Sequence, residues 1–194
     1  MLKYKIAISG KANSGKNTVA NLLGSNLSEY YKILAFADPI KEMVLNMFPE
    51  ADSNCLYGPS QLRSNQIPNA FKNGSSPLTY RQCLIDLGEL GRSYNQNIWV
   101  NKLNDKIYKN SFISEGFQTV IVSDLRQLNE FNYLKDKGFF IIRLNRDLSL
   151  KLDHKTETNL DDMESSFDYL LNNNGTLDDL RKEIQVIIEK IKKQ

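Results

Sequence analysis

The chain is poor in the residues on which several classes of protein depend. Its 194 residues include two cysteines, Cys55 and Cys83, and a single histidine, His154. The cysteines lack C-x-x-C spacing and have no histidine near them, so we expect neither a disulfide framework nor a structural zinc site. A reducing cytoplasm is the setting that this composition favours.

Long apolar runs and an excess of charge are also absent. No stretch approaches the roughly 20 apolar residues of a membrane helix, and the run Ile6-Ala7-Ile8 is too short for a signal peptide. The net charge of +2 gives no sign of nucleic acid or a membrane as a partner. Length and composition suit one soluble domain over residues 1–194, with a homodimer left open.

β-prone runs alternate with amphipathic helical patterns along the chain. This alternation is typical of an α/β fold with a mostly parallel sheet. Residues 50–77, which are rich in Pro, Asn, Ser and Gly, are interpreted as an irregular insertion. The final helix is expected to begin after a capping box formed by Thr176 and Asp179. The predicted strands cover residues 3–9, 32–36, 119–123, 139–144 and 167–171.

The segment GKANSGKNT carries the most specific pattern in the chain. It fits G-x-x-x-x-G-K between a predicted strand and a predicted helix, where backbone N–H groups and the helix N-terminus attract phosphate. Lys16 is expected to reach the β- and γ-phosphates of a nucleotide. The ATP-binding candidates of this loop are Gly10, Lys11, Ala12, Asn13, Ser14, Gly15, Lys16, Asn17 and Thr18.

A magnesium site is expected beside this loop. Asn17 stands where a hydroxyl usually serves Mg²⁺, and either its amide oxygen or the hydroxyl of Thr18 can take that place. The apolar run Val120–Val122 ends in Ser123-Asp124, the form of a strand whose acid holds Mg²⁺ or its waters. The alternative for Asp124 is an N-cap of the following helix.

Five arginines lie at helix or loop positions around this predicted site. Arginine pairs bidentately with phosphate oxygens, and phosphoryl transfer needs positive charge around the moving group. One such arginine alone would more often form a surface salt bridge. Together they favour phosphoryl transfer to a small molecule: they are Arg81, Arg92, Arg126, Arg143 and Arg146.

Several segments, in the same order, resemble those of the phage deoxynucleoside monophosphate kinases. The loop resembles that family's G-x-x-x-S-G-K-[DN]-T, which also accommodates Asn17. The other resembling segments are Ala37–Lys41, Arg81–Arg92 with Leu87-Gly88 and the following Trp99-Val100, Ser123–Arg126 with Glu130, Asp153–Glu157, and Asn174–Leu177. The lid-like segment has one residue fewer than that family's D-x-H-x-[ST]-E.

The resemblance implies a P-loop kinase-like, three-layer α/β/α fold with a five-stranded sheet, an acceptor-side insertion at about 50–98 and a lid at about 145–160. It implies transfer of the γ-phosphoryl of ATP to a deoxynucleoside 5′-monophosphate with Mg²⁺. The implied catalytic residues are Lys16, Arg126, Arg143 and Arg146, and Asn174 and Gly175 join the ATP site. The implied acceptor residues are Asp38, Lys41, Arg63, Arg81, Arg92 and Trp99; the metal ligands are Asn17, Thr18 and Asp124; the lid residues are His154, Thr156 and Glu157.

Two alternatives stay open. Animal-type phosphomevalonate kinases share the S-D-x-R and lid features, so the acceptor need not be a nucleotide. A nucleotide-regulated binding protein without kinase activity is the alternative from another class. The base preference is also open, because residues 50–77 show no readable acceptor motif.

Overall fold

The computed structural model describes residues 2–108, 116–147 and 160–193. The chain divides into two compact units. The first comprises residues 1–36 and 103–194, and the second comprises residues 37–102. The second unit therefore contains the whole segment at about 50–98 that was expected to serve the acceptor.

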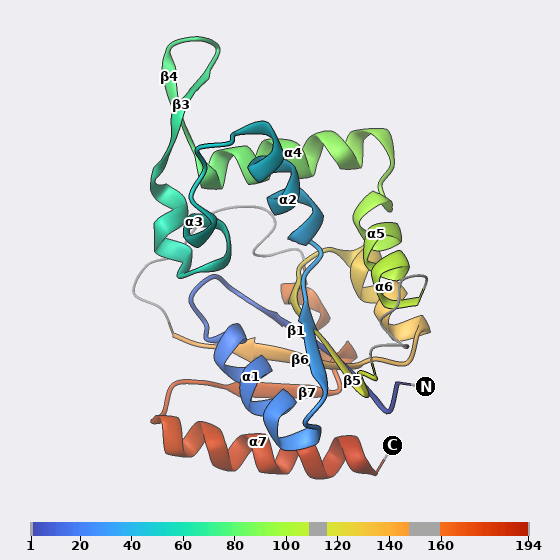
Figure 1. Cartoon of the computed structure of the whole chain (residues 1–194). Coiled ribbons are helices and arrows are strands. Elements are labelled where there is room, and N and C mark those ends of the chain that lie inside the picture. Colours follow the sequence, from blue (N-terminus) through green and yellow to red (C-terminus); the bar gives the residue numbers. More distant parts are fainter. Residues whose placement is uncertain (1, 109–115, 148–159, 194) are drawn as a thin grey trace. The chain divides into compact units, whose positions relative to one another are not determined.

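The first unit is built on a five-stranded sheet whose neighbouring strands are all parallel. The strand order is β2-β5-β1-β6-β7, with β1 in the middle (Figure 1). All five predicted strands are confirmed, and none of their ends differs by more than two residues. The strands are β1 (Tyr4–Gly10), β2 (Tyr31–Leu34), β5 (Thr119–Leu125), β6 (Phe140–Asn145) and β7 (Tyr169–Asn172).

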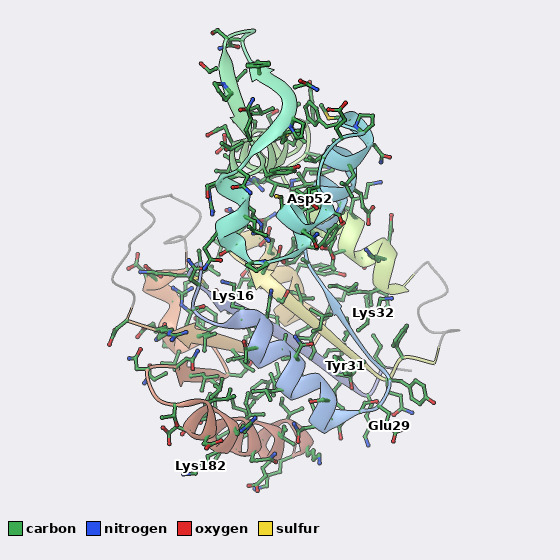
Figure 2. All side chains as sticks on the ribbon, turned by 60° about the vertical axis from the view of Figure 1, so that its left-hand side comes forward. Lys16, Glu29, Tyr31, Lys32, Asp52 and Lys182 are labelled. Carbon is green, nitrogen blue, oxygen red and sulfur yellow. The ribbon has the colours of Figure 1, made fainter. Side chains whose placement is uncertain are left out.

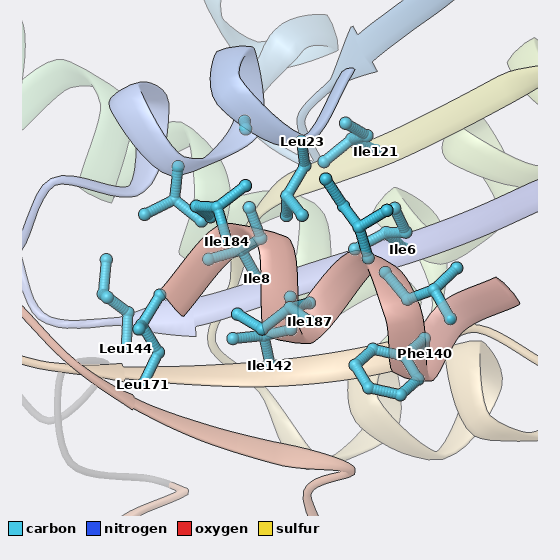
Figure 3. Close-up of a cluster of buried hydrophobic side chains, with 14 of the residues drawn as sticks. Ile6, Ile8, Leu23, Ile121, Phe140, Ile142, Leu144, Leu171, Ile184 and Ile187 are labelled. Carbon is cyan, nitrogen blue, oxygen red and sulfur yellow. The ribbon is translucent and has the colours of Figure 1, made fainter. Parts of the chain in front are cut away.

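One face of this sheet is covered by α1 (Lys16–Leu27) and α7 (Leu177–Lys192). Figure 3 shows Ile184 and Ile187 of α7 packed among side chains of β1 and β6. Because side chains alternate along a strand, the residues between these core positions face the opposite side. There α6 (Leu128–Asp136) contacts β6, and Phe131 packs edge-on against Phe167.

The ends of the helices in this unit follow local signals. The predicted capping box of Thr176 and Asp179 is confirmed at the start of α7. A second capping box, of Gln127 and Glu130, starts α6.

The short 3₁₀ helix η3 (Asp161–Ser166) precedes β7, and α5 (Ile98–Tyr108) begins in the second unit and ends in the first. No helix in the described part of the chain is long and apolar enough to cross a membrane.

The second unit contains two longer helices, α2 (Asp38–Met47) and α4 (Tyr80–Tyr94). Its core is formed by Val44, Leu56, Ile67, Tyr80 and their buried neighbours. Asp38 is the first residue of α2, and Ala37 is the N-cap. Pro39 lies in the first turn, where its missing N–H breaks no helical hydrogen bond.

The prediction of an irregular insertion at residues 50–77 is wrong. These residues form α3 (Ser53–Tyr57), η1 (Ser60–Ser64) and the antiparallel strands β3 (Gln66–Lys72) and β4 (Ser76–Thr79). Pro68 in β3 and Pro77 in β4 fit because, among the described residues, each strand pairs only with the other, so a missing N–H need not break a ladder. Asn73-Gly74, with φ of 53° and 75°, supplies the hairpin turn, which is a signal that the sequence did carry.

Candidate active site

The loop between β1 and α1 has the close approaches that its two glycines permit. A Cβ on Gly10 would lie 2.7 Å from the carbonyl oxygen of Leu144. Gly15 has a φ of 101°, and a Cβ there would lie 2.6 Å from Nδ2 of Asn173. A side chain at position 10 would therefore clash with β6, and one at position 15 would displace the amide of Asn173.

The side chain of Lys16 binds backbone carbonyls of its own loop. Its Nζ donates to the carbonyl oxygens of Gly10 at 2.7 Å and of Lys11 at 2.6 Å. Figure 2 shows Lys16 where the loop meets α1. Within the described residues, the buried hydroxyl of Ser14 in the same loop has no hydrogen-bond partner. An ammonium, an unsatisfied hydroxyl and a helix N-terminus at one loop are the elements of a phosphate cradle.

Asn173 is a residue of this site that the sequence did not reveal. It follows β7 and is buried, and its Nδ2 donates to the carbonyl oxygen of Ser14 at 2.8 Å. Its own backbone N–H donates to the carbonyl of Asn145 at 2.8 Å. Asn173 therefore fixes the loop to the carboxyl ends of two other strands. The only sequence signal was its place beside the predicted ATP residue Asn174.

Arg143 lies on the face of the sheet opposite α1 and α7. It is the register partner of Ser9 on β1, and its Nη1 donates to Ser9 Oγ at 2.9 Å. Its Nη2 pairs with the carboxylate of Asp161, which also lies 3.4 Å from Nζ of Lys11. The structure thus brings together two predicted residues, Arg143 and Lys11, through an acid that the sequence did not reveal. The role of Arg143 at the transferred group stays a prediction.

Asp124 lies within β5 and ties that strand to the turn after β2. Its Oδ1 accepts a hydrogen bond from the backbone N–H of Phe36 at 2.7 Å. The alternative in which Asp124 caps the next helix is wrong, because α6 begins at Leu128 and Gln127 is its N-cap.

The residues predicted to hold Mg²⁺ are oxygen donors, which this ion prefers. Asn17 and Thr18 are exposed in the first turn of α1, and Asp124 contributes a carboxylate. Over residues 2–108, 116–147 and 160–193, no three His, Cys, Asp or Glu side chains group to hold a metal. This donor set fits an ion that keeps several waters and relies on substrate phosphates, as Mg²⁺ usually does.

The other predicted residues of the first unit are placed as follows. Arg126 is half-buried after β5, and its backbone N–H donates to Glu130. Arg146 is exposed after β6. Asn174 exchanges two hydrogen bonds with Asp147, at 2.8 and 2.9 Å. Gly175 lies beside Asp179 of the capping box, and His154, Thr156 and Glu157 lie outside the described residues.

In the second unit, Lys41 is a buried lysine with a defined partner. It is 8% exposed, pairs with Asp38 at 2.9 Å and lies 4.8 Å from the ring centre of Tyr57. Burial, then the charges of Asp38 and Glu42, raise the pKa of the Tyr57 phenol above its ordinary value. The helical spacing of Asp38 and Lys41 brings these two predicted acceptor residues together.

The remaining acceptor candidates hold parts of the second unit in place. Arg63 donates to the carbonyl of Leu56 at 3.1 Å, and Arg81 donates to that of Ser60 at 2.9 Å.

The indole of Trp99 is buried against Gly91, where a Cβ would lie 2.3 Å from its ring. Trp99 Nε1 donates to the carbonyl of Gly88, and the guanidinium of Arg92 passes over the same glycine. Trp99 therefore serves packing within the unit.

Comparisons with known proteins agree with this geometry. Residues 89–184 match the family model of deoxynucleotide monophosphate kinase. A protein of Acanthamoeba polyphaga mimivirus, whose provisional name is deoxynucleotide monophosphate kinase, is 29% identical over 92% of this chain and 93% of its own length.

A solved structure of dephospho-CoA kinase from Campylobacter jejuni shares the fold. It is 17% identical, has a TM-score of 0.50, and the match covers 100% of this chain and 98% of that one. The resemblance drawn from the sequence and the expected P-loop kinase-like fold are both confirmed. The chain is therefore similar to the deoxynucleotide monophosphate kinases, to whose family model residues 89–184 match.

Proposed function

We propose that the protein transfers the γ-phosphoryl of ATP to a deoxynucleoside 5′-monophosphate, giving the diphosphate and ADP. Similarity to the deoxynucleotide monophosphate kinases supports phosphotransfer between nucleotides. The observation that carries the proposal is the loop from Gly10 to Lys16, whose lysine, buried hydroxyl and helix N-terminus converge on one place.

In this proposal Lys16 exchanges its two carbonyl partners for the β- and γ-phosphate oxygens of ATP. A charge-assisted bond to phosphate is stronger than one to a neutral carbonyl, so the exchange is favourable. The loop's backbone N–H groups and the N-terminus of α1 hold the phosphates in line. Phosphoryl transfer depends mainly on such positioning and charge stabilisation.

Asn17, Thr18 and Asp124 are the residues proposed to hold Mg²⁺, which would neutralise charge on the phosphates when bound. Arg126, Arg143 and Arg146 are proposed to add positive charge around the transferred group. Lys41 and Arg81 are proposed to serve the acceptor's 5′-phosphate. The buried ammonium of Lys41, which pairs with Asp38, suits a second anion because its charge is held in a low-dielectric environment.

The test is a panel of acceptors with ATP and Mg²⁺. The four deoxynucleoside monophosphates, their ribose counterparts and phosphomevalonate are each assayed for diphosphate product. Product from at least one deoxynucleotide is expected. Product from phosphomevalonate alone would replace the proposed acceptor, and ATP binding without any product would favour a nucleotide-regulated binding protein.

Two lysine variants, one in the loop and one on the surface of α7, test the assignment of the nucleotide site. Lys16→Ala should lower kcat by ~10²-fold or more, since it removes a preorganised charge at the transferred group. Lys182→Ala removes an exposed lysine of α7 and should leave turnover unchanged. Near-normal turnover of a folded Lys16→Ala variant would contradict the assignment of the loop.

A further inference from the structure

We propose that Asp161 is a positioning residue whose carboxylate holds Arg143 against the sheet and competes with the phosphates of ATP for Lys11. The inference rests on the proposed function of the phosphate loop and adds a residue that neither the sequence patterns nor the comparisons assign. It concerns only the first unit, where all of the groups involved lie.

Asp161 binds its two cations through different oxygens. Oδ1 pairs with Nη2 of Arg143, and Oδ2 lies 3.4 Å from Nζ of Lys11. Both contacts therefore exist together. One carboxylate links the phosphate loop after β1 to the neighbouring strand β6.

The two contacts differ in strength. The side chain of Arg143 is 6% exposed, bonds Ser9 and lies 5.9 Å from the ring centre of Phe167. A guanidinium buried in this way requires an anion, so its pairing with Asp161 is a lasting one.

Lys11 is 47% exposed and its contact is long. Exposed pairs of this kind stabilise a protein little, because water screens the two charges. Of the two ion pairs of Asp161, the one with Lys11 is therefore the one that breaks more easily.

A triphosphate bound in the loop offers Lys11 a better partner than one carboxylate. The carbonyl of Lys11 already accepts from Lys16, so its backbone belongs to the phosphate cradle while its side chain is held by Asp161. Binding ATP would move the ammonium from Asp161 to phosphate. Asp161 would keep its ion pair with Arg143 throughout. The ammonium of Lys11 would therefore exchange Asp161 for phosphate without disturbing the sheet.

The decisive measurement is the equilibrium dissociation constant for ATP, with EDTA and again with Mg²⁺. Asp161→Asn should tighten ATP binding by about two- to fivefold, the fold-change that corresponds to an exposed ion pair. Asp162→Asn is the matched control, because it makes the same charge change one residue away at an exposed position. A purely structural role of Asp161 would weaken binding and never tighten it.

A double-mutant cycle with Lys11→Met distinguishes two mechanisms: release of Lys11 from Asp161, and long-range repulsion between Asp161 and ATP. If Asp161 acts by holding Lys11, Asp161→Asn should have no effect on ATP binding once Lys11 is methionine. An equal gain in both backgrounds would mean simple repulsion between Asp161 and ATP, and would overturn the inference.

Loss of charge at Asp161 deprives the buried guanidinium of Arg143 of this anion, so thermal unfolding must accompany these titrations. If Asp161→Asn does not fold, Asp161→Glu keeps the anion for Arg143 and extends it towards Lys11. That variant should weaken ATP binding, and unchanged or tighter binding would overturn the inference. Failure of the wild-type protein to bind ATP would instead remove the proposed function, and the inference with it.

Discussion

Nδ2 of Asn173 donates a 2.8 Å hydrogen bond to the carbonyl oxygen of Ser14, joining residues 159 positions apart. The same amide lies where a side chain on Gly15 would have to go. The conformation of the phosphate loop therefore depends on Asn173, which follows β7 and lies outside the loop. A loop held in this way is preorganised for an anion, which lowers the cost of ordering it on binding.

Asn173→Ala should consequently weaken ATP binding. The buried carbonyl of Ser14 loses its donor, which costs about 1–3 kcal/mol, and the loop gains freedom. We expect a KM for ATP raised about tenfold, with the KM for the acceptor little changed. Steady-state kinetics with each substrate varied separately test this, and Asn172→Ala, at the exposed neighbouring position, is the control. Equal effects of the two variants would contradict the role of Asn173.

Asp124→Asn should separate a structural from a metal-binding role. An asparagine oxygen can still accept from the N–H of Phe36, so unfolding should occur near the wild-type temperature. The lost negative charge should weaken the apparent affinity for Mg²⁺ and lower kcat by about tenfold or more. Activity measured across a magnesium titration tests this.

Asp124→Ala is the companion variant, because it also removes the hydrogen bond to Phe36 and should lower the unfolding temperature. Superimposable magnesium curves for wild type and Asp124→Asn would exclude Asp124 from the metal site.

Arg81 and Arg92 should have unequal roles. They stand eleven residues apart on α4, so their Cα atoms lie roughly 16 Å from each other and cannot easily hold one phosphate. Arg81→Ala should raise the KM for the monophosphate at least tenfold and leave the KM for ATP nearly unchanged. Arg92→Ala should have the smaller effect on the acceptor.

Arg81→Lys refines this measurement, since lysine keeps the charge but loses the forked donor geometry. It should recover only part of the acceptor affinity. If variants of both arginines raised the KM for ATP and left the KM for the acceptor unchanged, the assignment of α4 to the acceptor site would be wrong.

Tyr133 should make the fold sensitive to alkaline pH. Burial, with smaller contributions from Tyr108 and Asp105, raises the pKa of its phenol to about 12, and its hydroxyl donates to Asn104 Oδ1 at 2.8 Å. An unfolded tyrosine ionises near pH 10. The stabilisation from the neutral phenol is therefore complete below pH 10 and is lost as the pH rises from 10 to 12.

Denaturant unfolding of wild type and Tyr133→Phe at several pH values tests this. The variant should be less stable at pH 8, since it lacks the bond to Asn104, by about 1 kcal/mol. The difference should shrink between pH 10 and 12, because only the wild type loses the contribution of Tyr133. A constant difference across that range would contradict the assignment.

The sequence determined the features of this protein that depend on neighbouring residues. Apolar runs located all five strands, and the capping box at Thr176 located the start of α7. The glycines and lysine of GKANSGKNT located the phosphate loop, because backbone freedom and a positive charge are properties of those residues themselves. The hairpin of residues 66–79 was missed although Asn73-Gly74 indicated it, since the Pro, Asn, Ser and Gly content of residues 50–77 favoured an irregular insertion.

Only the tertiary structure decided how this loop is supported. Asn173 reaches Ser14, Asp161 reaches Lys11 and Arg143, and Asp124 reaches Phe36, which is 88 residues away. None of these pairs has a local pattern, because each depends on which strands are neighbours. The order β2-β5-β1-β6-β7 brings the carboxyl ends of β5, β6 and β7 to the same edge of the sheet as the loop after β1. That order follows from packing the helices on the two faces of one parallel sheet, which no short segment specifies.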